Sequence, residues 1–183
     1  MKSRKKICLI AFCFLMLFAL STCAYAKKPS KATVKKAYKQ YLSKTGIAIR
    51  GGKAVYVDIN RDGIQELFYA RSSNLTNLYK KCIVCTYKKG TVIKAGEFEG
   101  VLDMSYSSKK KRLCVGQRAA VGSWTSIYKL SNGILKKTVS YHPGMGADFA
   151  YKNNYNKKIS VKEYSNAIKK YSKWRKLKIN WWL

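Results

Sequence analysis

The sequence predicts an α+β fold in which an antiparallel β-sheet of about seven to nine strands is flanked by an N-terminal and a C-terminal helix. Three observations support this prediction. Apolar residues recur at helical spacing near both ends of the chain, short apolar runs separated by turn residues fill its middle, and two of those turns are typical of hairpins. With 183 residues, the chain has the length of one ordinary domain.

The first 26 residues have the three parts of a secretory signal peptide. Four basic residues stand among the first six, 14 uninterrupted apolar residues follow at 7–20, and Ala24 and Ala26 mark a cleavage site. As a helix the apolar run spans about 21 Å, which is shorter than the roughly 30 Å apolar core of a bilayer. We therefore predict cleavage after Ala26, a single secreted domain over 27–183 that is extracellular or associated with the cell wall, and no transmembrane span after cleavage. A retained anchor and lipid attachment at Cys23 are the alternatives.

The chain is strongly basic. It has 38 Lys and Arg against 8 Asp and Glu, and removal of the four basic leader residues leaves 34 against 8, a net charge of +26. Such a surplus attracts polyanions, and export removes access to chromosomal DNA and ribosomes. We therefore expect an anionic surface polymer as partner, either teichoic acid, lipid headgroups or glycans, and no specific nucleic acid.

Two segments have helical signals. At 31–44, apolar residues stand at i, i+4, i+7 and i+8 (Val34, Tyr38, Tyr41 and Leu42), and Thr45-Gly46 ends the helix. Near the C-terminus, Ser160 and Glu163 match a capping box, and apolar residues at helical spacing continue to Tyr171. These patterns predict one helix over 31–44 and another over 161–171.

The middle of the chain has β signals. The apolar runs lie at 54–57, 67–70, 79–87, 91–98, 101–106, 112–115, 124–130 and 134–141. Lys88-Lys89-Gly90 and Ser131-Asn132-Gly133 separate pairs of these runs and predict hairpin turns. The segments 87–94 and 128–136 also resemble each other, with Gly90 and Gly133 43 positions apart, which indicates a weak internal repeat of β-meander units.

One motif has chemical content. Residues 58–67 read D-x-N-x-D-G-x-x-E-L. Calcium takes six to eight oxygen ligands, and calcium loops supply them from alternate positions. The predicted ligands are the side chains of Asp58, Asn60, Asp62 and Glu66 together with the carbonyl of Ile64. Because the flanks are strand-like and Tyr69 replaces the last acid of an EF-hand, we predict a Ca²⁺ loop that joins two strands.

A polar β-turn is the alternative interpretation of this motif, since Asn, Asp and Gly are common turn residues. Against it, three of the eight carboxylates of the chain gather within nine residues, where they repel one another unless a cation is present. Arg61 offers partial relief of that repulsion.

The same residues resemble a calcium-binding loop of known protein families. The order Val57-Asp-Ile-Asn-x-Asp-Gly-Ile-x-Glu-Leu67 resembles the calcium loops of FG-GAP/VCBS-type repeats. With the hairpins and the Lys/Tyr-rich C-terminal helix, it is also similar to small secreted proteins of Gram-positive gut bacteria. The resemblance implies calcium at Asp58, Asn60, Asp62 and Glu66, and it implies no catalytic residue.

Three cysteines follow the leader. Cys82 and Cys85 form a CxxC pair inside a β-run, where an offset of three places the thiols on opposite faces. Redox CxxC pairs instead lie at a helix N-terminus. We expect buried apolar thiols, and one disulfide of this pair with Cys114 is the alternative.

We predict that the protein is not an enzyme. The one His, His142, stands in an expected turn, and no Ser, Cys or Thr nucleophile has a recognisable partner. Glu97 and Glu99 lie on one strand face, and they are expected to be solvated charges. The alternative function is a secreted hydrolase of wall polymers or glycans, which would bring Glu97, Glu99 and Asp103 together in a deep pocket.

Overall fold

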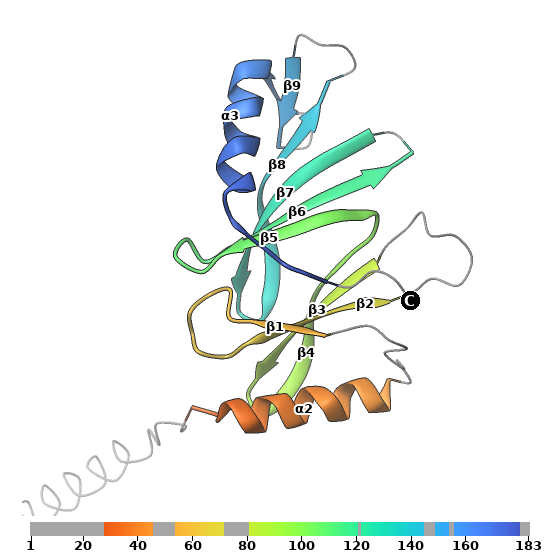
Figure 1. Ribbon diagram of the computed structural model, residues 1–183, viewed down its shortest axis with the longest axis vertical. Helices are drawn as coiled ribbons and strands as arrows, with labels where there is room; N and C mark the ends of the chain where they lie inside the picture. The colour runs from red at the N-terminus through yellow and green to blue at the C-terminus, as the bar shows by residue number, and fades with distance from the viewer. Residues whose placement is uncertain are drawn as a thin grey trace, which may run out of the picture.

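The computed structural model describes residues 28–45, 54–71, 81–120, 122–144, 149–153 and 156–179. It confirms the predicted α+β fold: two helices and antiparallel sheets of four and seven strands make up the described part (Figure 1). The predicted signal peptide, with Cys23, lies outside the described residues. Neither helix of the described part is long and apolar enough to cross a membrane.

Helix α2 (Lys31–Lys44) has the bounds that the sequence predicts. Ser30 caps its N-terminus, where the side-chain oxygen accepts a hydrogen bond from Thr33 N at 3.1 Å. Its apolar face buries Val34, Tyr38 and Leu42. This face packs on the four-stranded sheet, so that the helix covers one side of that sheet (Figure 1).

The four-stranded sheet has the order β1-β2-β3-β4 and forms the middle layer of the fold. Its strands are β1 (Val55–Val57), β2 (Glu66–Arg71), β3 (Lys81–Lys88) and β4 (Thr91–Phe98). Alternation along β3 sends Ile83 and Cys85 toward α2, and Cys82 and Val84 toward the other sheet. The predicted placement of the two thiols on opposite faces is therefore confirmed.

The seven-stranded sheet has the order β10-β9-β8-β7-β6-β5-β11. Its strands are β5 (Val101–Ser107), β6 (Arg112–Ala119), β7 (Gly122–Ser131), β8 (Ile134–Pro143), β9 (Phe149–Lys152), β10 (Lys157–Ser160) and β11 (Arg175–Lys176). Part of it packs against the four-stranded sheet through a core that includes Met104, Leu113 and Val115. Helix α3 (Val161–Ser172), capped by Ser160 as predicted, covers the region of Tyr141, Ala150 and Ile159.

The strands divide between two sheets instead of forming one, and eleven of them lie in the described residues. The change of sheet occurs at Glu99–Gly100, between β4 and β5. Gly100 has φ +62°, and a Cβ there would lie 2.0 Å from the carbonyl oxygen of Arg118, so the turn requires glycine. Strands β9, β10 and β11 are short, with two to four residues each, and therefore have little apolar pattern of their own.

The two hairpins of the sequence repeat are structurally equivalent. Lys89 and Gly90 have φ of 49° and 86°, and Asn132 and Gly133 have φ of 54° and 83°, as type I′ turns require. Each hairpin also has a register shift, between Val84 and Cys85 in one and between Ile127 and Tyr128 in the other, 43 positions apart. The turns meet where Lys88 Nζ donates to the carbonyl of Asn132 at 2.9 Å.

We predict that Tyr38→Phe lowers the stability of the fold. Tyr38 is fully buried, and its hydroxyl donates to the carbonyl of Gln65 at 2.8 Å, which ties α2 to the start of β2. Loss of one such bond costs about 1 kcal/mol, which is a fall in Tm of about 2–4 °C for a domain of this size. Thermal melts followed by circular dichroism measure the change. Tyr164→Phe on α3 is the control, and an equal fall in both variants would contradict the role of the Tyr38 hydroxyl.

Candidate functional site

The D-x-N-x-D-G segment connects β1 to β2, as the sequence predicts for a loop between two strands. The last residue of β1, Val57, pairs with Glu66, the first residue of β2. Between them the chain turns back through two residues in the left-handed region, Arg61 with φ 58° and Gly63 with φ 80°. The loop therefore has the tight, closed form that its Asn, Asp and Gly residues favour.

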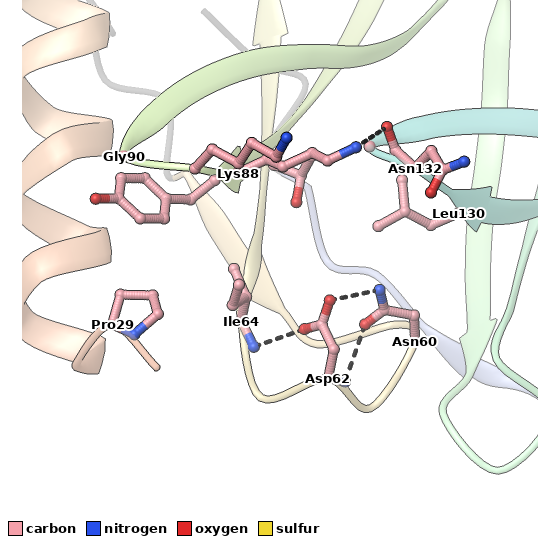
Figure 2. A pocket seen from close by; sticks show the side chains of 12 residues that line it. Pro29, Asn60, Asp62, Ile64, Lys88, Gly90, Leu130 and Asn132 are labelled. Atoms are coloured by element: carbon pink, nitrogen blue, oxygen red, sulfur yellow. Dashed lines mark hydrogen bonds between the residues drawn. The ribbon is translucent and has the colours of Figure 1, made fainter. Parts of the chain in front are cut away.

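The polar side chains of the loop bond to the loop backbone. Asp58 Oδ2 accepts from Gly63 N at 2.8 Å, Asn60 Oδ1 from Asp62 N at 3.1 Å, and Asp62 Oδ1 from Ile64 N at 2.7 Å. The second oxygen of Asp62 accepts from the amide of Asn60 at 2.8 Å (Figure 2). These bonds hold the predicted ligands of the loop in a compact arrangement.

Glu66 differs from the other loop acids because its side chain is fully buried. One carboxylate oxygen accepts from Ile59 N at 2.9 Å, and the other lies 3.3 Å from the hydroxyl of Thr86 on β3. Burial, together with the nearby charges of Asp62 and Asp58, raises the pKa of Glu66 to about 8, and the hydrogen bond from Ile59 acts against this rise. The three acids of the motif therefore act on one another electrostatically.

The donor set suits calcium. All five predicted ligands offer oxygen, and Asp58 Oδ1 is buried without a hydrogen-bond partner among the described residues. Within the same residues, no three His, Cys, Asp or Glu side chains already surround a common point as a formed metal site does. The side chains are bonded to loop amides instead, so the loop has the chemistry of a calcium site and the hydrogen bonding of a polar turn.

Several residues that the sequence did not indicate hold the loop in place. Ile59 is 1% exposed and inserts its side chain into the core between the two sheets. Tyr38 binds the carbonyl of Gln65 from α2, Thr86 contacts Glu66 from β3, and Ser108 Oγ donates to the carbonyl of Asp58 at 3.1 Å from the turn after β5. These partners lie far from the loop in the sequence, so no local pattern identifies them.

A cleft of about 580 Å³ opens beside the loop (Figure 2). Asn60, Asp62 and Ile64 form one wall, and the two hairpin turns, with Lys88 and Asn132, form the opposite wall. The cleft exposes one edge of the predicted calcium ligands to solvent.

The other candidate residues have structural surroundings. Glu97 and Glu99 both pair with Lys81, and Lys94 Nζ lies 2.9 Å from Glu97. These two acids are thus held in ion pairs, Glu97 on β4 and Glu99 in the turn after it. His142 lies in β8 and not in a turn as predicted. Its ring stacks on the ring of Trp124, with the two centroids 6.1 Å apart.

The three described cysteines are buried and free. Burial raises the pKa of the Cys82 thiol, that of Cys85 to about 11 and that of Cys114 to about 12. The thiols are therefore protonated at neutral pH, as expected for buried apolar side chains.

Comparison of the chain with protein-family models, with curated proteins and with solved structures finds no match. The resemblance to FG-GAP/VCBS-type loops therefore remains a prediction from residues 57–67.

We predict that the protein loses stability as the pH rises when a chelator keeps it free of calcium. The pKa of Glu66 is raised from 4.5 to about 8 in the fold, so the folded state favours the protonated carboxyl. The stabilisation of the fold by protonated Glu66 is fully present below about pH 4.5 and is lost as the pH rises through about 8. Over this range the free energy of unfolding falls by at most about 1.4 kcal/mol per pH unit.

Urea unfolding at a series of pH values in chelator measures this effect. Glu66→Gln removes the titrating group, so the difference between wild type and variant isolates Glu66 from every other group. Parallel pH profiles for the two proteins would contradict the prediction.

Proposed function

We propose that the chain is a secreted, non-enzymatic protein whose loop at 58–66 binds calcium and whose basic surface associates electrostatically with an anionic cell wall or cell surface. The calcium ligands would be Asp58, Asn60, Asp62, the Ile64 carbonyl and Glu66. Calcium supplies positive charge to a loop that gathers three acids, and it serves a structural role in this proposal.

The buried and unpartnered oxygen of Asp58 carries the calcium part of the proposal. A buried carboxylate oxygen without a partner costs free energy, which a cation would recover. Glu66 adds a second carboxyl that is unfavourable as an anion in its buried position. A divalent ion at this loop would satisfy the Asp58 oxygen and balance the Glu66 anion, whereas a plain polar turn leaves the Asp58 oxygen without a partner and requires a proton on Glu66.

The charge balance supports the surface part of the proposal. With 38 basic and 8 acidic residues in the chain, most basic side chains have no carboxylate with which to pair. Two of the acids, Glu97 and Glu99, are already used by Lys81 and Lys94. The remaining cations attract polyanions such as teichoic acid, anionic lipid headgroups or acidic glycans.

We predict that millimolar calcium raises the melting temperature of the purified protein. Calcium binds the folded loop and hardly the unfolded chain, so a 100-fold excess over Kd stabilises the fold by about 2.7 kcal/mol. For a domain of this size the shift in Tm is roughly 5–10 °C. Melts in chelator and in calcium measure it, and calorimetry measures the heat of binding.

Asp58→Ala should remove both the shift and the heat. Asp103→Ala, which deletes an exposed carboxylate on β5, is the control and should retain both. Identical wild-type melts in chelator and calcium, with no heat of binding, would establish that 58–66 is an ordinary turn.

We predict that the purified protein binds isolated anionic walls at low salt and is released as the salt concentration rises. Exposed charges are screened beyond about 8–10 Å near 0.1 M salt. Sedimentation of the protein with walls over a salt series measures the bound fraction. Retention that is unchanged at about 1 M salt would instead indicate a receptor that does not depend on charge.

A further inference from the structure

A second cleft, of about 620 Å³, adjoins the two ends of the loop at Asp58 and Gln65. We call it the basic cleft. Arg175, Lys176 and Lys178 line it from β11 and the segment after it, Asp58 from the loop, and Tyr56 and Tyr106 from β1 and β5. The segment from β11 to Lys178 reaches this position because β11 pairs with the end of β5, with Arg175 opposite Tyr106.

The lining of the basic cleft has an excess of positive charge. Arg175, Lys176 and Lys178 are exposed, and within the described residues no ion pair joins any of them to a carboxylate. Asp58 supplies the one negative charge of the lining. The site therefore has three cationic groups available for an oxyanion, and the fork of Arg175 is suited to bind two oxygens of a phosphate.

More cations stand on the turn after β5, where Ser108 also lines the cleft. The turn after β5 places Lys109, Lys110 and Lys111 in solvent. Ser108 fixes this turn to the loop through the carbonyl of Asp58, and Arg112 braces it by donating to the carbonyl of Lys111 at 3.1 Å. Positive charge thus continues from the cleft onto the adjacent turn. This arrangement suits a polymer with regularly spaced negative groups better than it suits a single small anion.

Asp58 belongs to both the basic cleft and the loop. Asp58 is one of the residues that line the cleft, and its carboxylate oxygen Oδ2 accepts from Gly63 N across the loop. Without a cation, the negative charge of Asp58 opposes an anion in the cleft. A cation bound to the loop would cancel that charge, so the two binding events would favour each other.

We propose that the basic cleft binds the phosphate groups of an extended phosphodiester polymer, and that calcium at the loop strengthens this binding through Asp58. The phosphate site rests on the cleft alone. The coupling rests on the calcium loop of the proposed function. The aromatic rings of Tyr56 and Tyr106 give the cleft apolar walls against which the polyol or sugar part of such a polymer packs.

The first experiment measures binding of a short poly(glycerol phosphate) oligomer to the purified protein in chelator at constant ionic strength. The double variant Arg175→Ala/Lys178→Ala should weaken binding by about tenfold or more, because it removes two charge-assisted contacts. The double variant Lys162→Ala/Lys169→Ala removes the same charge from α3 and should have a much smaller effect.

Equal losses in the two double variants would overturn the site, because they would show attraction to the overall charge only. Polyglutamate of equal charge and vesicles of phosphatidylglycerol are measured in parallel. Binding of either as tight as that of the oligomer, with equal sensitivity to Arg175 and Lys178, would overturn the assignment to a phosphodiester polymer.

The second experiment tests the coupling. Calcium should raise the affinity for the oligomer by about fivefold or more, and the oligomer should raise the affinity for calcium by the same factor. Asp58→Asn keeps the size of the side chain and an acceptor for Gly63 N. It should bind the oligomer more tightly than wild type in chelator and should no longer respond to calcium.

The outcomes separate the two proposals. If calcium alone gives no heat of binding to wild type, the calcium loop fails, while the oligomer affinities of the Arg175/Lys178 and Asp58 variants in chelator still decide the phosphate site. If calcium binds but leaves the affinity for the oligomer unchanged, the coupling is overturned. If Asp58→Asn still responds to calcium, the effect arises from calcium on the polymer and not from the loop.

Discussion

Glu66 places a carboxyl group in the core at the point where β2 begins, and the geometry of the loop depends on how that group is satisfied. Its oxygens hold Ile59 N from the loop and contact Thr86 from β3, so one side chain joins the loop to the neighbouring strand. Ile59 then fills the core between the sheets, and Asp58 is left at the loop surface that faces the basic cleft. Because burial makes the Glu66 anion unfavourable, this arrangement is most stable with a proton or a cation nearby.

Local sequence signals predicted the secondary structure well. The apolar spacing of 31–44 and the capping box at Ser160 predicted the two helices, and Lys89-Gly90 and Asn132-Gly133 predicted the hairpin turns, because each of these signals acts within a few residues. Alternation along β3 likewise placed Cys82 and Cys85 on opposite faces, since side-chain direction in a strand depends only on position.

The division into two sheets and the surroundings of the loop could not be predicted in this way. The change of sheet depends on the close approach of Gly100 to the Arg118 carbonyl. The position of the loop depends on hydrogen bonds from Tyr38, Thr86 and Ser108. Each of these contacts joins residues far apart in the sequence, and the amino-acid types involved do not by themselves indicate such a contact. The motif predicted which oxygens the loop offers, but their bonds to the loop amides follow from a backbone conformation that sequence spacing does not determine.

The pairing of β11 with β5 has a consequence for the order in which the molecule folds. Every other pair of adjacent strands in the described sheets consists of strands that follow each other along the chain, whereas β5 and its partner β11 are separated in sequence by β6 to α3. During synthesis from the N-terminus, β5 therefore has an open edge until residues 175–176 are available to pair with it. The cationic wall of the basic cleft comes from this same segment, so a C-terminally shortened chain would lose the wall together with Leu177 and Ile179, which are buried in the same core cluster as Ile59 of the loop.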